Sequence, residues 1–335
     1  MHMPETDNFK PLDRRLSVAP MMEWTDRHFR YFLRLISRQT LLYTEMVHAR
    51  AVVNGDRERL LGFSGCEHPL ALQLGGSEAS VLADAAAIAQ EWGYDEVNLN
   101  VGCPSDRVQS GRFGACLMRE PDTVAACVAA MQDRVDIPVT IKCRIGVDEQ
   151  DSDQALAAFV DTVSRAGCRH FIVHARKAWL KGLSPKENRE KPPLNYERVE
   201  RLAAEFPGLE IAINGGIGGL DQAEAFLKQF HGVMIGRAAC SNPWLLAEAD
   251  GRIFKRNTAP ESRTAVALAY ADYCADMHQA GVPRSMLLRN IHGLFQGVPG
   301  ARQWRRTLSE SMSGKLAPDA IIHRALDAVP ATDAA

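Results

Sequence analysis

Residues 210–237 form the stretch EIAINGGIGGLDQAEAFLKQFHGVMIGR, which holds two short apolar runs that each end in glycine. The runs Glu210–Asn214 and Gly232–Ile235 are almost continuously apolar, which is typical of parallel strands covered on both faces. The turn Asn214-Gly215-Gly216-Ile217 follows the first run, and Gly236-Arg237 follows the second. This stretch therefore predicts one unit of an alternating β/α fold.

Further runs of the same kind precede this unit, with helical patterns between them. The additional predicted strands are Leu16–Met22, Leu41–Val47, Leu70–Leu74, Glu96–Val101, Val139–Arg144 and His170–His174. Asp122 and Ser152 are predicted to cap two of the intervening helices. Eight strands within about 225 residues favour a closed (β/α)8 TIM barrel over the alternative, a doubly wound open sheet.

The β-like runs stop near Thr258, and the rest of the chain is helical in pattern. We therefore predict an α/β barrel domain over residues 11–257 and a smaller all-helical domain over residues 258–330. Met1–Lys10 and Ala331–Ala335 are polar or featureless and are expected to fray.

The composition is that of a soluble globular protein, with 46% hydrophobic and 24% charged residues. No apolar stretch approaches the roughly 20 residues of a membrane span, and no signal peptide is evident, so a cytoplasmic location is expected. The eight cysteines contain no C-x-x-C pair, which indicates neither a disulfide framework nor a metal site.

The net charge of −2 does not favour a nucleic-acid-binding protein, but the charge is unevenly distributed. Residues 176–191 hold six Lys or Arg against two Glu, and residues 281–315 hold six against one. From charge alone, such runs are more often solvated faces than binding surfaces.

Glycine turns after the last two strands of a barrel commonly hold a phosphate through backbone N–H groups. Gly215, Gly216 and Gly236 occupy these two turns, and Arg237 would add a charge-assisted contact. One Gly-Gly pair alone is usually just a turn. Two glycine turns at the two expected strand ends predict a phosphate site.

Unusual polar residues also end the middle strands. Lys142 follows the apolar run Pro138–Ile141, so it must be paired, functional, or snorkelling at the barrel rim. Gln73 and His174 end two other predicted strands. Local sequence leaves a structural role for His174 as good an explanation as a catalytic or binding role.

Cys103 lies in a constrained turn between Gly102 and Pro104, after the polar residues Asn98 and Asn100. A lone cysteine is often a small buried apolar residue. A thiol with an ordinary pKa, near 8.5, is protonated at neutral pH and can donate a proton. The glycine-rich segment 109–115 is predicted to be a mobile loop that could close over a substrate.

Taken together, these motifs resemble the dihydrouridine synthase family, in order from Leu16 to Arg237. The segments that carry the resemblance are Ala19-Pro20-Met21, Gln73-Leu74, Asn98-Leu99-Asn100-Val101-Gly102-Cys103-Pro104, Lys142-Cys143-Arg144, Val173-His174-Ala175-Arg176, Asn214-Gly215-Gly216 and Gly236-Arg237. The segment Lys186–Leu194 further resembles the bacterial A-type branch of the family.

The resemblance implies FMN at the barrel mouth, reduced by NADPH. Hydride would pass to C6 of a uridine and Cys103 would protonate C5, while Asn100 would help to hold the uracil. Lys142 would stabilise negative charge at N1/O2 of the flavin, and Gln73 would hydrogen-bond the same ring. The implied cofactor-binding residues are Pro20, Met21, Met22, Gln73, Lys142, His174, Asn214, Gly215, Gly216, Gly236 and Arg237.

The family also implies a tRNA partner, whose target uridine must be flipped out to reach the flavin. The A-type branch implies uridines 20 and 20a in the D-loop, close to the tRNA elbow. The residues expected to contact tRNA are Arg176, Lys186, Arg189, Arg302, Arg305 and Arg306. Trp304 lies among the last three of these residues, which favours an RNA-binding face over a face of solvated charge. A monomer is expected, because tRNA needs an open barrel mouth.

Two other functions remain open at the level of sequence. One is a small-molecule flavin oxidoreductase of the dihydroorotate dehydrogenase type, against which the basic helical domain argues. The other is a protein that binds tRNA without chemistry, against which Cys103, Lys142 and the glycine turns argue. Sequence does not distinguish NADPH from NADH or identify the exact uridine.

Overall fold

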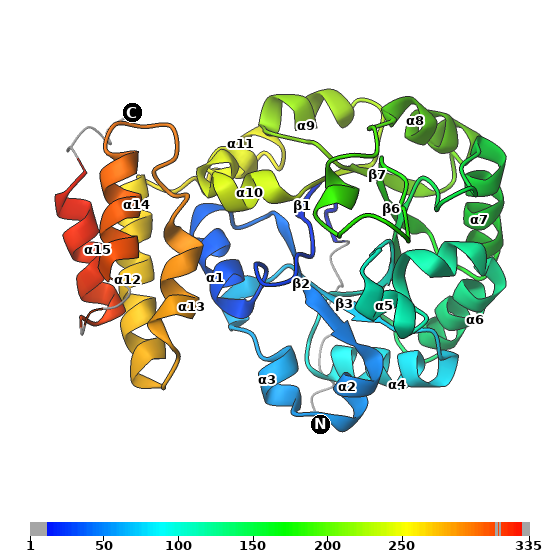
Figure 1. Ribbon diagram of the computed structural model, residues 1–335, viewed down its shortest axis with the longest axis horizontal. Helices are drawn as coiled ribbons and strands as arrows, with labels where there is room; N and C mark the ends of the chain where they lie inside the picture. Colours follow the sequence, from blue (N-terminus) through cyan, green and yellow to red (C-terminus); the bar gives the residue numbers. More distant parts are fainter. Residues whose placement is uncertain (1–11, 312–313, 315, 330–335) are drawn as a thin grey trace, which may run out of the picture.

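The computed structural model describes residues 12–311, 314 and 316–329. Parallel strands close into a barrel in chain order, because the eighth strand pairs back onto the first (Figure 1). The strands are β1 (Leu16–Val18), β2 (Leu41–His48), β3 (Leu70–Gly75), β4 (Glu96–Val101), β5 (Val139–Arg144), β6 (His170–His174), β7 (Glu210–Asn214) and β8 (Gly232–Ile235). The predicted (β/α)8 barrel is confirmed, and the open sheet is excluded.

Helices surround the barrel and follow it at the C-terminal end. Those of the barrel are α1 (Arg27–Ile36), α2 (Ala49–Asn54), α3 (Arg57–Leu61), α4 (Ala79–Glu91), α5 (Asp106–Ser110), α6 (Pro121–Gln132), α7 (Asp153–Arg165), α8 (Tyr196–Glu205), α9 (Leu220–Phe226), α10 (Arg237–Ser241) and α11 (Ala249–Arg252). The short 3-10 helices are η1 (Gly65–Glu67), η2 (Gly114–Arg119), η3 (Glu187–Arg189), η4 (Pro243–Leu246) and η5 (Arg289–Ile291). The C-terminal helices are α12 (Arg263–Gln279), α13 (Arg284–Leu288), α14 (Ala301–Glu310) and α15 (Pro318–Asp327).

Strands β4 to β8 span the predicted residues, whereas β1 is shorter than predicted. It ends at Val18 because Pro20 has no N–H to donate to a sheet and the chain then turns. In that turn, the Met21 carbonyl accepts hydrogen bonds from Trp24 N at 3.1 Å and Thr25 N at 2.9 Å. Pro20, Met21 and Met22 therefore form a loop beyond the strand.

One of the two predicted helix caps is confirmed. Ser152 Oγ accepts the N–H of Ala155 at 3.0 Å and caps α7. The prediction for Asp122 was wrong, because α6 begins with Pro121 and places Asp122 within its first turn. A proline at this position needs no hydrogen-bond partner for its nitrogen, so the helix starts earlier than predicted.

The C-terminal helices dock on α1, as Figure 1 shows at the left of the barrel. Tyr31 of α1 stacks on Tyr273 of α12 with ring centroids 3.8 Å apart. The Tyr273 hydroxyl also lies 2.7 Å from His28 Nδ1. Arg289 forms an ion pair with Asp26, the N-cap residue of α1. The all-helical C-terminal region is confirmed, and a domain boundary at 257/258 stays a prediction.

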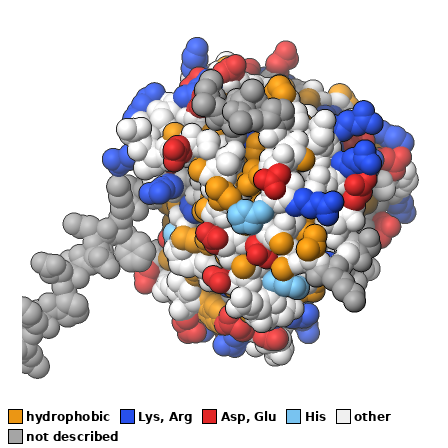
Figure 2. Space-filling model, turned by 90° about the vertical axis from the view of Figure 1, so that its left-hand side faces the viewer, with side chains coloured by type: hydrophobic (Ala, Val, Ile, Leu, Met, Phe, Trp, Pro, Cys, Tyr) orange, Lys and Arg blue, Asp and Glu red, His pale blue; other side chains and the backbone are white. Residues whose placement is uncertain are grey.

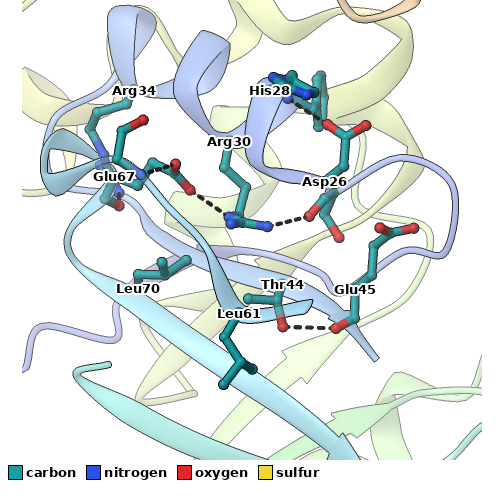
Figure 3. Close-up of polar contacts among 12 residues, drawn as sticks. Asp26, His28, Arg30, Arg34, Thr44, Glu45, Leu61, Glu67 and Leu70 are labelled. Carbon is teal, nitrogen blue, oxygen red and sulfur yellow. Dashed lines mark hydrogen bonds and ion pairs between the residues drawn. The ribbon is translucent and has the colours of Figure 1, made fainter. Parts of the chain in front are cut away.

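A buried ion pair and hydrogen bonds to backbone carbonyls fix α1 against the segment before β3, as shown in Figure 3. Arg30 Nε bonds Glu67 Oε2 at 2.7 Å, and Glu67 has no exposed surface. Arg34 Nη2 donates to the carbonyls of Glu67 at 2.8 Å and Thr40 at 2.9 Å. Because α1 is anchored in this way, the helices packed on it have a defined position relative to the barrel.

The outer end of the helical region is shown in Figure 2. Acidic, histidine and apolar side chains occupy the centre of this face, and most Lys and Arg side chains lie toward its edges. Within the described ranges, no helix combines the length and apolar character needed to cross a bilayer.

Candidate active site at the barrel mouth

Adjacent strands bring polar side chains together at the C-terminal end of the barrel. In the strand register, Asn100 is opposite Lys142 and His174 is opposite Asn214. Gln73 of β3 bonds Asn100 directly. These five residues, predicted from separate motifs, therefore lie around one opening.

Lys142 is partly buried and paired. Its Nζ donates to Asn214 Oδ1 at 3.1 Å, and Asn214 Nδ2 donates to the Met234 carbonyl at 2.7 Å. Burial, reinforced by the nearby Arg144 cation, lowers the pKa of Lys142 to about 8. Lys142 is therefore a cation that releases its proton more readily than a surface lysine.

A chain of side-chain amides connects Gln73 to the Cys103 turn. Gln73 Nε2 donates to Asn98 Oδ1 at 2.8 Å, and Asn100 Nδ2 donates to Gln73 Oε1 at 2.8 Å. Asn100 Oδ1 accepts the backbone N–H groups of Gly102 at 3.1 Å and Cys103 at 2.9 Å. Asn100 thus positions the turn that carries the thiol.

The same chain continues into the interior of the barrel. Asn98 Nδ2 donates to Thr140 Oγ1 at 2.9 Å, and Thr140 Oγ1 donates to Glu96 Oε1 at 2.7 Å. The Tyr43 hydroxyl bonds Glu96 Oε1 at 2.6 Å, and Arg14 Nε bonds Glu96 Oε2 at 2.6 Å. Sequence reasoning did not single out Glu96, although an acid that opens an apolar strand was a usable signal.

Cys103 is half-buried at the mouth, with its Sγ 3.6 Å from Ser105 Oγ. The Cys103 carbonyl accepts the N–H of Ala115 at 2.9 Å. This close return needs glycine at 114, because a Cβ there would lie 2.5 Å from the Cys103 carbonyl oxygen and the residue has φ +75°. The turn geometry leaves the thiol at the opening rather than inside the core.

The predicted loop 109–115 is largely ordered secondary structure. It covers the end of α5 and the start of η2. Gln109 Nε2 donates to the carbonyls of Pro104 and Leu180, each at 2.8 Å. These bonds tie the segment to the loop after β6, and its closure over a substrate stays a prediction.

Arg144 clamps the Cys103 turn, a role that its motif alone did not reveal. The side chain is 3% exposed, and its Nε donates to the Gly102 carbonyl at 2.8 Å. Its Nη1 donates to the carbonyls of Lys177 at 3.0 Å and Asn188 at 3.1 Å. Burial lowers the pKa of Arg144 to about 10. Arg144 therefore joins the thiol turn to the loop after β6.

His174 is held in its neutral form. Its pKa lies well below the ordinary value, mainly because the ring is buried and also because the cations Arg144 and Lys142 lie nearby. A neutral imidazole can donate one hydrogen bond and accept another. His174 can therefore contact a polar ring at the mouth without adding charge.

Two glycine turns lie beside His174, after β7 and β8. Gly215 and Gly216 have φ of +115° and +71°, and a Cβ on Gly216 would lie 2.6 Å from Leu194 Cδ1. A Cβ added to Gly236 would have one neighbour within 4 Å, the Cβ of Ala19 at 3.9 Å. The first turn thus requires glycine at 215 and 216, and the second turn is open around Gly236. Together they fit a phosphate cradle.

Three arginines surround this cradle. Arg237 Nη1 bonds Glu190 Oε1 at 2.7 Å, and Arg176 donates to the Pro192 carbonyl. The pKa of Arg189 is lowered, mainly because the side chain is partly buried and also because the positive charge of Arg237 lies nearby. Three guanidinium groups thus lie within electrostatic reach of a single carboxylate, that of Glu190, which, of the three, only Arg237 contacts. This excess of positive charge fits a phosphate-bearing cofactor.

Other predicted residues lie around the rim or farther away. Met22 is 56% exposed beyond β1, and Lys186 is exposed in the loop after β6. Arg302, Arg305 and Arg306 lie on α14, in the helical region at the left of Figure 1. The structure therefore brings the predicted cofactor residues together but sets the α14 arginines apart.

Trp304 has a different role from the one expected. It is fully buried, and its Nε1 donates to the Ile291 carbonyl at 3.1 Å. It packs on Phe295 with ring centroids 4.6 Å apart. Trp304 therefore belongs to the core of the helical region, and the prediction that it strengthens an RNA-binding face was wrong.

The fold and the site define a (β/α)8-barrel protein with a phosphate cradle and a thiol at its mouth. The family model described as "Dihydrouridine synthase (Dus)" matches residues 17–328, and the chain belongs to this family. The resemblance inferred from the motifs is confirmed.

Curated relatives share most of the chain. The tRNA-dihydrouridine(20/20a) synthase of Shewanella oneidensis is 58% identical over 302 residues, covering 90% of each chain. The proteins of that name from Vibrio cholerae and Synechocystis are 55% and 54% identical, covering 94% and 93% of this chain and 97% and 94% of theirs.

Similar solved structures support the fold. A 2-naphthoyl-CoA reductase has a TM-score of 0.56 at 11% identity, covering 74% of this chain and 50% of that one. Morphinone reductase has a TM-score of 0.50 at 14% identity, covering 70% of this chain and 84% of that one.

Proposed function

We propose that this chain is a tRNA-dihydrouridine(20/20a) synthase, an oxidoreductase that reduces the C5–C6 bond of uridines 20 and 20a in the tRNA D-loop. The observation that carries the proposal is the Cys103 turn, held by Asn100 and Arg144 at the mouth of a barrel with a phosphate cradle. The identity to relatives of that name supports the substrate.

FMN, once reduced by NADPH, would supply hydride to C6 of the uracil. The glycine turns, Asn214 and Arg237 would hold its phosphate end, and Pro20, Met21, Met22, Gln73, Lys142 and His174 would line its ring. For the phosphate to use Arg237, that side chain must exchange the Glu190 carboxylate for the phosphate. Both partners are exposed, so the exchange costs little.

Cys103 would complete the reduction by transferring the proton of its Sγ to C5 of the uracil. Because Asn100 and Arg144 hold the N–H and the carbonyl of the peptide group between Gly102 and Cys103, the backbone that presents the thiol is fixed. Lys142 and neutral His174 would donate hydrogen bonds to the polar edges of the two rings. Solvent at the mouth would restore the proton of Cys103.

The surface around the mouth supports a polyanionic substrate. Arg176, Lys186 and Arg189 extend from the loop after β6, and we propose that they contact tRNA phosphates. Arg302, Arg305 and Arg306 would contact the same tRNA farther from the target. A monomer located in the cytoplasm, with its barrel mouth free, is part of this proposal.

The test is to incubate FMN-loaded protein with NADPH and tRNA that lacks modifications, then map dihydrouridine by mass spectrometry. We expect dihydrouridine at positions 20 and 20a. Cys103→Ala should keep bound FMN and lose most product, whereas Cys66→Ala, which removes an exposed thiol on η1, should retain activity. Absence of dihydrouridine with flavin-loaded protein, or full activity of Cys103→Ala, would contradict the proposal or its proton donor respectively.

A further inference from the structure

An open cavity of about 640 Å³ lies beside the candidate active site. It is formed by the loops after β5 and β6 and by the start of α8. Its lining includes Asp151, Lys177, Trp179, Lys181, Lys191 and Arg198. None of these side chains has a part in the proposed reaction, and we refer to the space as the Trp179 cavity.

The backbone of Trp179, which forms the aromatic wall of the cavity, is held by hydrogen bonds. Trp179 N donates to Asn188 Oδ1 at 2.8 Å, and Asn188 Nδ2 donates to the Trp179 carbonyl at 2.9 Å. Asn188 has no exposed surface, whereas the Trp179 side chain is 44% exposed. The buried amide thus fixes the backbone of Trp179 at the wall of the cavity, where the residue stays partly exposed.

Charges around the ring favour an anion. Lys177 Nζ lies 4.7 Å from the indole centroid and is held there by Asp151, at 2.9 Å. Lys191 and Arg198 also form ion pairs with acids. Lys181 is exposed and has no polar partner among the described residues. It is therefore available to bind a phosphate group.

Direct hydrogen bonds connect the cavity to the Cys103 turn. Arg144 bonds the Gly102 carbonyl on one side and the carbonyls of Lys177 and Asn188 on the other. Gln109, on the helix after the Cys103 turn, bonds the Leu180 carbonyl, next to Trp179. The loop that lines the cavity is therefore joined directly to the turn that carries the thiol.

We propose that the Trp179 cavity binds one further nucleotide of the RNA, close to the reduced uridine, with its base against the Trp179 indole and a phosphate near Lys181. The volume suits one nucleotide. An aromatic face beside cations is the chemistry that recognises unstacked bases of single-stranded RNA. This inference rests on the proposed tRNA substrate.

The adenosine end of the nicotinamide reductant offers similar chemistry. We favour RNA because the cavity is open and exposed Lys181 is part of its lining, as suits a polymer that passes across a surface. The experiment must therefore measure the RNA and the reductant separately.

The first measurement is the Kd of FMN-loaded protein for tRNA that lacks modifications. Trp179→Ala should raise the Kd roughly five- to 150-fold, and Trp179→Phe should restore most of the affinity. Lys181→Ala should weaken binding and reduce the salt dependence by about one phosphate contact. Lys228→Ala, which removes an exposed lysine just before β8 at the opposite end of the barrel, should leave the Kd unchanged.

The second measurement identifies the nucleotide. A series of D-loop RNAs, each lacking one base, should contain one position near the target where removal of the base weakens binding to wild-type protein. That same removal should have little further effect on Trp179→Ala, because two changes to one contact are not additive. If removal of each base lowered the RNA affinity equally in wild type and in Trp179→Ala, the proposal would be overturned.

The reductant is measured without RNA, from the anaerobic rate at which NADPH bleaches the flavin. Trp179→Ala and Lys181→Ala should bleach at the wild-type rate. Slower bleaching with unchanged tRNA affinity would assign the cavity to the reductant and overturn the proposal, as would unchanged values of both. A wild-type protein that makes no dihydrouridine would instead remove the proposed function, so the two failures are distinguishable.

Discussion

The side-chain oxygen of Asn100 accepts the backbone N–H of Cys103 at 2.9 Å. The amide that the family resemblance assigns to the uracil is therefore also part of the support for the thiol. Its nitrogen is bonded to Gln73, so the thiol turn, the middle strands and the proposed flavin contact form one hydrogen-bonded unit.

The first prediction concerns this support. Asn100→Ala should lower kcat at least about tenfold, because two backbone N–H groups lose their acceptor and the turn loosens. Asn100→Asp keeps the acceptor and should retain more activity than the alanine variant. Single-turnover reduction of tRNA checks this order. If the aspartate variant is as inactive as the alanine variant, the main role of Asn100 is the contact made by its nitrogen.

The second prediction concerns the buried acid at the base of the polar chain. Glu96→Gln should lower the free energy of unfolding by about 3 kcal/mol, because Arg14 would lose its buried counter-ion. Urea unfolding followed by circular dichroism measures the change. Glu91→Gln, at an exposed position on α4, is the matched control and should stay within about 0.5 kcal/mol of wild type.

The third prediction concerns the phosphate cradle. Gly216→Ala should weaken FMN binding by at least about tenfold, because the residue has φ +71° and the new Cβ would lie 2.6 Å from Leu194 and 2.9 Å from the Tyr196 hydroxyl. Titration of apoprotein with FMN, followed by fluorescence quenching, gives the affinity. Gly218→Ala adds a Cβ with nothing within 4 Å and should bind FMN normally. Comparable affinities for the two variants would argue against a phosphate at Gly216.

The fourth prediction is a pH dependence from Lys142. Its pKa is lowered from 10.5 to about 8 in the folded apoprotein, so the unfolded chain binds more protons between these values. The stability of wild type relative to Lys142→Met should therefore rise as the pH increases from about 8 to 10.5, by roughly 1–3 kcal/mol. Urea unfolding of both apoproteins across this range tests the sign, and a constant difference would refute the lowered pKa.

The fifth prediction separates packing from RNA binding on α14. Trp304→Ala should destabilise the protein by about 3–5 kcal/mol, because it empties a fully buried site. Arg302→Ala should leave the melting temperature unchanged and weaken tRNA binding several-fold, with a shallower salt dependence. Thermal melts and tRNA titrations of both variants measure these effects. Normal tRNA affinity in Arg302→Ala would remove α14 from the proposed RNA-binding surface.

Much of the barrel could be predicted because each strand is specified locally. A parallel strand covered on both faces needs a short apolar run, and β4 to β8 begin and end where those runs do. The glycine turns and the polar strand ends also follow directly from the chain. Since the C-terminal ends of all strands in a barrel meet at one mouth, the sequence was sufficient to group Gln73, Asn100, Lys142, His174 and Asn214.

The hydrogen-bond partners of these residues were decided by the tertiary structure. Glu96 meets Arg14 across 82 positions of sequence, and Arg144 reaches Asn188 across 44. Such pairs leave no local pattern, because they depend on how distant strands and loops pack. The same holds for Trp304, whose arginine neighbours suggested an exposed face while packing placed the indole in the core. The sequence by itself determined the barrel and the residues at its mouth, and only the tertiary structure decided which of them support the thiol, because those contacts join strands far apart in the chain.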